Sequence, residues 1–267
     1  MTRHRLFNRR VAIKEMGKAG LAIVVFGAAA CSDDAGTVPT PTPGSQAVTS
    51  APPPAPSTTA RGATTTAAAV SGSAFQRVDL GFVSAYILYR AGEAALVDTG
   101  VAGSADAIEA ALIEVGLDWE AVGHVILTHK HPDHVGSIDV VLARAPGAAV
   151  YAGAPDIPSI AAAVEPQPVG NGDLVFDLEV IETPGHTAGH ISVLDGVAGI
   201  LVAGDALNGA SGGIDGPNPE FSENMTVALE SVRKLAGFTF EVALFGHGDP
   251  LFEGASAAVA ELAAEMA

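Results

Sequence analysis

Short apolar runs separated by turn residues recur along residues 75–267, and other stretches carry apolar residues spaced three or four positions apart. The short runs are rich in β-branched and aromatic residues and predict strands. These strands lie at 75–80, 82–89, 94–98, 125–127, 149–151, 178–181, 191–194, 200–203 and 242–245. The three-to-four spacing predicts helices after residue 104, over 132–145, over 225–235 and around 259–266.

Two dipeptides, Asn171-Gly172 and Asp195-Gly196, predict hairpin turns between neighbouring apolar runs. The strands fall into two groups along the chain, and helices follow each group. A sheet must bury one face against another layer, so this order favours two sheets packed face to face with helices outside. We therefore expect one α/β domain over residues 75–267.

The first 31 residues have the organisation of a signal peptide. A basic segment, 1–18, precedes the 12-residue apolar run 19–30. The pair Arg9-Arg10 resembles a twin-arginine export signal, and Cys31, directly after three alanines, resembles a lipoprotein cleavage box. We expect Cys31 to be lipidated and to attach the exported chain to the outer face of the cytoplasmic membrane. A secreted or periplasmic protein is the alternative.

Residues 32–74 are rich in Pro, Thr and Ala and contain few large apolar side chains. Such a segment buries too little apolar surface to offset the entropy lost on ordering. Residues 32–74 are therefore predicted to be a disordered linker that tethers the domain.

Charge narrows the possible partners. The formal net charge of the chain is −17, but residues 75–267 hold 6 basic and 27 acidic residues, a net charge of −21. Phosphate backbones are repelled by such a surface, so no nucleic-acid partner is expected, and a heavily anionic substrate is disfavoured. The single cysteine excludes an intrachain disulfide and a cysteine-rich zinc module.

Residues 128–134 concentrate the candidate chemistry. Three imidazoles and one carboxylate lie between a predicted buried strand and a helix. In an extended loop, residues i and i+2 point the same way, so His129 and His131 can bind one metal ion. Asp133 and His134 face another side, where a second ion can bind. Imidazole and carboxylate ligands suit zinc, iron, manganese or nickel.

The pattern His129-x-His131-x-Asp133-His134 after an apolar strand resembles the metallo-β-lactamase superfamily. Four further motifs of that family occur in order: Asp98 in VDTG, His186 in TPGHT, Asp205 in AGD and His247 in FGHG. The resemblance covers residues 75–267 and implies a four-layer αβ/βα sandwich as the fold.

The resemblance also implies a role for each motif residue. His129, His131 and His186 would bind one divalent ion, Asp133, His134 and His247 a second, and Asp205 would bridge both. The expected ions are Zn²⁺, with iron or manganese as alternatives. A metal-bridging hydroxide would be the nucleophile, and Asp133 would also orient it and transfer its proton.

Several other residues have weaker predicted roles. Asp98 is expected to support the metal loops without binding metal. His190, four residues after His186, either bonds a ligand or a loop or is simply structural. Phe221, in a Gly-, Pro- and Asn-rich segment, and Tyr151 are candidates for the substrate pocket, with a surface position as the default for both.

The predicted function is hydrolysis of an ester, thioester or lactone bond in a neutral or weakly charged small molecule by a binuclear metal site. An aspartate at the bridging position, here Asp205, resembles the ligand set of hydroxyacylglutathione hydrolases and lactonases more than that of true β-lactamases. The 20 residues after His247 contain no Lys or Arg, which disfavours a glutathione thioester. A mononuclear-iron persulfide dioxygenase is the first alternative and a β-lactam hydrolase the second. The oligomeric state stays open.

Overall fold

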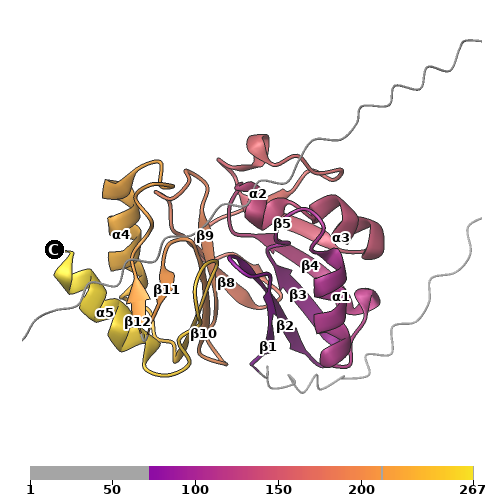
Figure 1. Cartoon of the computed structure of the whole chain (residues 1–267), viewed down its shortest axis with the longest axis horizontal. Coiled ribbons are helices and arrows are strands. Elements are labelled where there is room, and N and C mark those ends of the chain that lie inside the picture. Colours follow the sequence, from indigo (N-terminus) through magenta and orange to yellow (C-terminus); the bar gives the residue numbers. More distant parts are fainter. Residues whose placement is uncertain (1–71, 212, 267) are drawn as a thin grey trace, which may run out of the picture. The chain divides into compact units, whose positions relative to one another are not determined.

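A computed structural model describes residues 72–211 and 213–266 (Figure 1). The predicted signal peptide, Cys31 and nearly all of the predicted linker lie outside the described residues. Within the described ranges, none of the helices has the length and apolar character needed to cross a membrane.

The first sheet has six strands in chain order: β1 (Ala74–Asp79), β2 (Ser84–Arg90), β3 (Glu93–Val97), β4 (Val122–Leu127), β5 (Ala149–Gly153) and β6 (Gln167–Val169). The pairs β1–β2 and β2–β3 are antiparallel, whereas β3, β4, β5 and β6 run parallel. The carboxyl ends of β3, β4 and β5 therefore lie along one edge of this sheet.

The second sheet has the order β13-β10-β9-β8-β7. Its strands are β7 (Leu174–Val175), β8 (Leu178–Glu182), β9 (Ile191–Asp195), β10 (Ile200–Gly204) and β13 (Val242–Phe245). Strands β10 and β13 are parallel, so their carboxyl ends also lie together. A separate two-stranded ribbon consists of β11 (Asn208–Ala210) and β12 (Gly213–Asp215).

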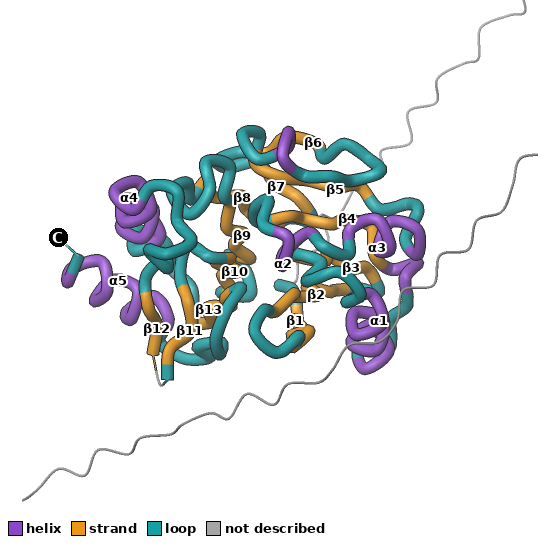
Figure 2. Tube along the Cα trace, turned by 45° about the horizontal axis from the view of Figure 1, so that its top comes forward, coloured by secondary structure: helices purple, strands orange, loops and turns teal. Residues whose placement is uncertain are grey.

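Helices lie outside both sheets, with α1 (Ala105–Glu114) and α3 (Ile138–Arg144) beside the first, and α4 (Met225–Leu235) and α5 (Ala255–Glu265) beside the second (Figures 1 and 2). Both faces of the first sheet are buried, and strand β4 has apolar side chains on each of them. Val125 and Leu127 pack in the core shared with α1 and α3, while Ile126 packs between the two sheets. A third core lies between the second sheet and α4 and α5. The expected four-layer αβ/βα sandwich is confirmed.

Two local predictions were wrong. Asn171-Gly172 is not a hairpin turn, because β6 and β7, on either side of it, belong to different sheets. The hairpin into β8 instead turns at Phe176 and Asp177, both with a φ of 53°, as a two-residue turn with positive φ at both positions requires. The helix predicted over 132–145 is divided into α2 (Pro132–Val135) and α3, with Gly136 between them against the backbone of Val101 and Ala102.

Candidate metal centre

The predicted ligands all lie where strands end. His129 and His131 follow β4, and α2 carries Asp133 and His134. His186 lies in the β8–β9 loop. Asp205 comes directly after β10, and only Gly246 separates His247 from the end of β13. The two sheets meet at this edge, where the N–H of Ile191 donates to the carbonyl of Thr128 at 2.9 Å and that of Ser84 donates to the carbonyl of Gly246 at 2.8 Å. Sheet packing thus joins loops that are far apart in sequence.

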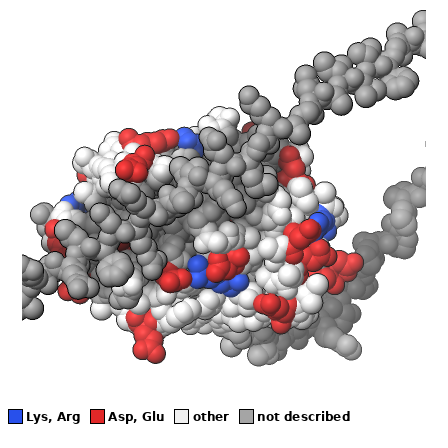
Figure 3. Space-filling model, in the orientation of Figure 1, with Lys and Arg blue, Asp and Glu red and all other residues white. Residues whose placement is uncertain are grey.

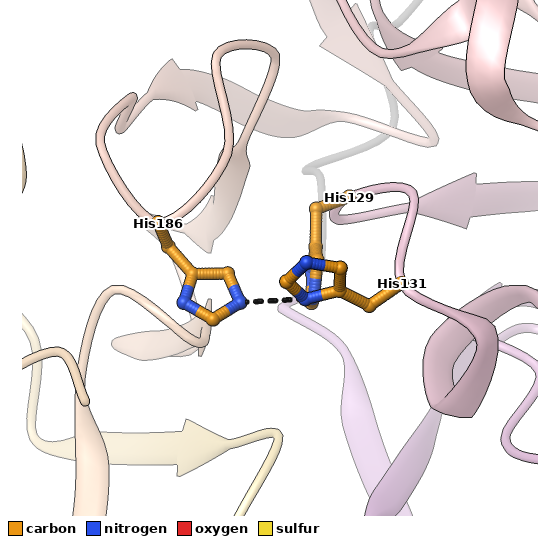
Figure 4. Close-up of side chains that lie close together, drawn as sticks. All are labelled: His129, His131 and His186. Carbon is orange, nitrogen blue, oxygen red and sulfur yellow. Dashed lines mark hydrogen bonds between the residues drawn. The ribbon is translucent and has the colours of Figure 1, made fainter. Parts of the chain in front are cut away.

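His129, His131 and His186 form the first cluster, and their side chains converge on one point (Figure 4). The Nδ1 atom of His131 lies 3.0 Å from Nε2 of His129 and 2.9 Å from Nε2 of His186. Three ring nitrogens at this separation, supplied by both halves of the sandwich, are suited to hold one cation.

Asp133, His134 and His247 form the second cluster. The Nε2 atom of His247 lies 3.4 Å from Oδ2 of Asp133. Asp205 lies between the clusters, because its Oδ2 is 3.3 Å from Nε2 of both His186 and His247, and its Oδ1 is 3.4 Å from Nε2 of His134. The structure therefore brings all seven predicted ligands together and puts one carboxylate in contact with both clusters.

Buried Asp98, directly after β3, fixes the orientation of two of the imidazoles. Its oxygens accept hydrogen bonds from the N–H and hydroxyl of Thr128, both at 2.8 Å, and contact Nδ1 of His134 at 2.7 Å. Since the Thr128 hydroxyl donates to Asp98, it accepts from Nδ1 of His129 at 3.0 Å. Both rings therefore direct the lone pair of Nε2 toward the centre.

Backbone and hydroxyl oxygens orient the other two rings in the same way. The Nδ1 atom of His247 donates to the carbonyl of Phe82 at 2.6 Å. The hydroxyl of Ser222 donates to the carbonyl of Asn218 at 2.7 Å, so it faces Nδ1 of His186, at 3.4 Å, as an acceptor. Four imidazoles thus present Nε2 to the same space.

His190 does not belong to either cluster but holds Asp205 in place. The backbone N–H of Asp205 donates to Nε2 of His190 at 3.0 Å, so the ring proton is on Nδ1 and donates to the hydroxyl of Thr183 at 2.8 Å. Burial lowers the pKa of His190 to about 3, which keeps the ring neutral and Nε2 free to accept. His190 therefore bonds the backbone of the loop that carries Asp205, which is one of the roles left open in the sequence analysis.

The residues fit a pair of cations on three grounds. First, Nε2 of His134 and Oδ1 of Asp205 are buried and lack hydrogen-bond partners, although buried polar atoms are almost always paired. Second, a Cβ atom at Gly246 would overlap Oδ1 of Asp205 and the ring of His134, so only glycine leaves this space open. Neutral imidazoles and carboxylates are also the donors that divalent metal ions prefer.

The electrostatics separate the two clusters. Burial holds the pKa of His129 well below its usual range and lowers that of His186 to about 4. In the second cluster, pairing with Asp133 and then Asp205 raises the pKa of His247 to about 10. Asp205 has a lowered pKa despite burial, chiefly because of His134, and His247 lowers the pKa of Asp133. The first cluster therefore contains the neutral rings of His129 and His186, whereas the second contains a His247 ring that favours its charged form beside two ionised carboxylates.

One residue that organises the first cluster, Asp156 in the loop after β5, was not predicted from any sequence pattern. Its fully buried carboxylate accepts from the N–H of Lys130 at 3.1 Å, the hydroxyl of Thr187 at 2.5 Å and the N–H of Gly189 at 2.8 Å. Lys130 lies between two ligands, and Thr187 is adjacent to His186. Asp156 therefore ties together the two loops that form the cluster.

A cleft of about 570 Å³ opens above the two clusters. Phe221 lines it, together with Phe82, which was not predicted. Tyr151 is absent from the lining among the described residues. Its ring stacks on that of His124, with centroids 5.9 Å apart, in the core between the sheets. The Tyr151 prediction fails because β5 directs this ring into the core.

Comparisons with known proteins identify the relatives of this chain. The family model described as "Metallo-beta-lactamase superfamily" matches residues 78–247. The uncharacterized protein YobT of Bacillus subtilis is 30% identical over 62% of this chain and 83% of its own length. A hydroxyacylglutathione hydrolase of Alkalilimnicola ehrlichii is 38% identical over 43% of this chain and 42% of its own length, so the chain spans less than half of that relative.

Solved structures show the same fold. A metallo-beta-lactamase family protein from Thermus thermophilus is 26% identical, with a TM-score of 0.58 over 73% of this chain and 79% of that one. A beta-lactamase from Chitinophaga pinensis has a TM-score of 0.57 at 17% identity, over 73% of this chain and 89% of that one.

Proposed function

Because the chain belongs to the metallo-β-lactamase superfamily of metallo-hydrolases, we propose that it uses two divalent ions to hydrolyse an ester, thioester or lactone in a small molecule. The observation that carries this proposal is the position of Asp205, whose carboxylate contacts ring nitrogens of both clusters. Two cations bound in neighbouring clusters would repel each other, and a carboxylate shared between them offsets that repulsion.

When bound, the two ions would lower the pKa of a water molecule between them and polarise the substrate carbonyl. His129, His131 and His186 would hold one ion, with Asp133, His134 and His247 holding the other; Zn²⁺ fits this donor set best, with iron or manganese as alternatives.

Asp133 is the group that accepts a proton in this proposal. It lines the cleft, is partly exposed, and has a pKa lowered by His247, so it is ionised near neutral pH. Water adds its oxygen to the acyl carbon and passes one proton to Asp133. The bond from that carbon to the leaving oxygen or sulfur breaks, and the leaving group takes up that proton from Asp133, which returns to its ionised form. The products are a carboxylic acid and an alcohol or thiol.

The relatives suggest different substrates, and the charge of this chain distinguishes among them. The Alkalilimnicola ehrlichii relative is a hydroxyacylglutathione hydrolase, and a relative from Emericella nidulans, 30% identical over 36% of its own length, is a thioesterase. No Lys or Arg lines the cleft among the described residues. A glutathione thioester carries two carboxylates, so we propose a neutral or weakly charged substrate.

The test is metal analysis and kinetics of the full chain. We expect about two zinc-like ions per chain and turnover of at least one neutral ester, thioester or lactone. Asp205→Ala should lower kcat/KM more than about 100-fold, since losing a mere partner of the ligands typically costs 10–100-fold in activity. Asp215→Ala is the matched control and should have no effect, because Asp215 is an exposed residue of β12.

One iron per chain together with persulfide oxidation would support the dioxygenase instead. Selective turnover of β-lactams would support the second alternative. Unchanged hydrolysis by the Asp205 variant would refute the two-metal proposal.

We also propose that the protein is exported and lipid-anchored. The support is the basic segment, apolar run and Cys31 of residues 1–31. Mass spectrometry of the membrane fraction should find an acylated Cys31 as the first residue of the mature chain. Mature protein with an unmodified Cys31 would refute the anchor.

A further inference from the structure

The walls of the cleft differ chemically from its floor. The floor contains Asp133 and Asp205 with three imidazoles of the centre, whereas the walls present two phenyl rings, Phe82 and Phe221, and one proline, Pro132. Two side-chain amides, of Asn208 and Asn218, complete the lining. The cleft thus offers acidic and metal-binding groups where a bond would be cut and uncharged surface elsewhere.

The two phenyl rings come from opposite halves of the sandwich, and each is 62% exposed. Phe82 lies in the β1–β2 turn, with its ring stacked beside that of His247 at 6.2 Å between centroids. Phe221 lies in the segment between β12 and α4, next to Ser222, whose hydroxyl faces His186 at 3.4 Å. One exposed ring therefore flanks each cluster, and a molecule centred on Asp205 has an aromatic surface available on both sides.

Two basic side chains beside the ligand loops, Lys130 and Arg77, are paired and do not line the cleft. Lys130 forms an ion pair with Glu223 at 2.7 Å. Arg77 contacts a carboxylate oxygen of Asp249 at 3.2 Å and donates to the carbonyl of Gly248 at 3.0 Å. In Figure 3, basic side chains on the visible face likewise lie near acidic ones. A carboxylate on an arm of the substrate would meet no Lys or Arg on the cleft walls among the described residues, and packing it against a phenyl ring would remove its hydration without a partner in return.

We propose that the cleft selects an uncharged ester, thioester or lactone with an apolar group on each side of the bond that is cut. One group packs on Phe82 and the other on Phe221, which places the carbonyl above Asp205. Burial of these exposed rings by the substrate supplies the binding free energy. This inference rests on the proposed hydrolytic function and adds the chemical class of the substrate.

The first experiment compares two p-nitrophenyl esters of six-carbon acids, the hexanoate and the monoester of adipic acid, which carries a terminal carboxylate. The metal-loaded full chain should hydrolyse the hexanoate with a kcat/KM at least about tenfold higher. Higher salt should leave most of this difference in place, because the cost of burying a carboxylate without a partner is a loss of hydration that ions do not screen. Equal or faster hydrolysis of the adipate ester would overturn the proposal while leaving the hydrolytic function intact.

The second experiment removes the rings one at a time. Phe82→Ala and Phe221→Ala should each raise KM for the hexanoate about tenfold, with kcat little changed and with the short p-nitrophenyl acetate less affected. Phe252→Ala is the matched control, because Phe252 is 58% exposed and does not line the cleft. If both variants behave like the control, the rings do not bind substrate and the proposal is wrong.

A third measurement separates this inference from the proposed function. A neutral alkyl ketone with two apolar arms has the shape of the ester but cannot be cleaved. Calorimetry should show that it binds the metal-loaded protein, and that Phe82→Ala or Phe221→Ala weakens binding about tenfold. Binding of this ketone without turnover of any ester, thioester or lactone would refute the hydrolytic function but support the cleft. Turnover without ring-dependent binding would refute the cleft alone.

Discussion

Asp156 provides the sharpest test of how the metal centre is held together. Replacing it with alanine removes the acceptor for two backbone N–H groups, of Lys130 and Gly189, and for the hydroxyl of Thr187. A buried donor without a partner costs about 1–3 kcal/mol. Relief of the buried negative charge offsets part of this loss. We therefore expect Asp156→Ala to lower the free energy of unfolding by about 3 kcal/mol, or Tm by about 6–12 °C for a domain of this size.

The same substitution should also weaken metal binding by the first cluster. The Asp156 contacts act on the loops of His131 and His186, and losing such partners of ligand loops typically costs 10–100-fold in metal affinity. Cobalt titration followed by visible absorbance measures this directly, and urea unfolding measures stability. Asp156→Asn keeps one acceptor oxygen and should recover about half of both losses.

The matched control is Asp139→Ala. Asp139 is exposed and accepts one backbone N–H, from Ala163 at 2.7 Å, away from the ligand loops. Its loss should cost about 1 kcal/mol or less and leave cobalt affinity unchanged. If Asp156→Ala destabilised the protein but bound cobalt like the wild type, Asp156 would support the fold and not the metal loops. No change in either quantity would refute the whole argument.

Three further outcomes are expected. Gly246→Ala should reduce metal content and activity sharply because its Cβ would overlap Asp205 and His134, whereas Gly147→Ala, with open space around it, should not; metal analysis of the two variants decides this. Burial raises the pKa of Tyr86 to about 12, so its neutral phenol stabilises the fold below pH 10 and that contribution is lost as the pH rises toward 12. Urea unfolding from pH 8 to 11.5 should show this loss in the wild type and less of it in Tyr86→Phe; equal pH slopes would contradict the reasoning. Removing metal with a chelator should lower Tm, and added zinc should restore it, as differential scanning calorimetry will show.

The sequence by itself determined most strand and helix positions, because strongly apolar runs and helical spacing have few alternative structures. Predicted and observed bounds coincide for β13 and α4 and differ by a few residues elsewhere. The short strands β6, β7, β11 and β12 were not predicted, since two or three residues carry too weak a pattern. At Asn171-Gly172 a local hairpin signal was overridden, because the chain crosses between the sheets there.

The candidate ligands were also predictable, because ligands must be His, Asp or Glu and here they follow strand ends in recognisable motifs. What only the tertiary structure decided is how distant loops meet. Asp156 has its partners 26 to 33 residues away, and nothing in its neighbourhood distinguishes it from a surface aspartate. Phe82 and Phe221 line one cleft although they come from different halves of the sandwich and are far apart in the chain. Local sequence encodes periodicity and ligand chemistry, whereas the packing of two sheets creates the contacts between loops that form the centre and its cleft.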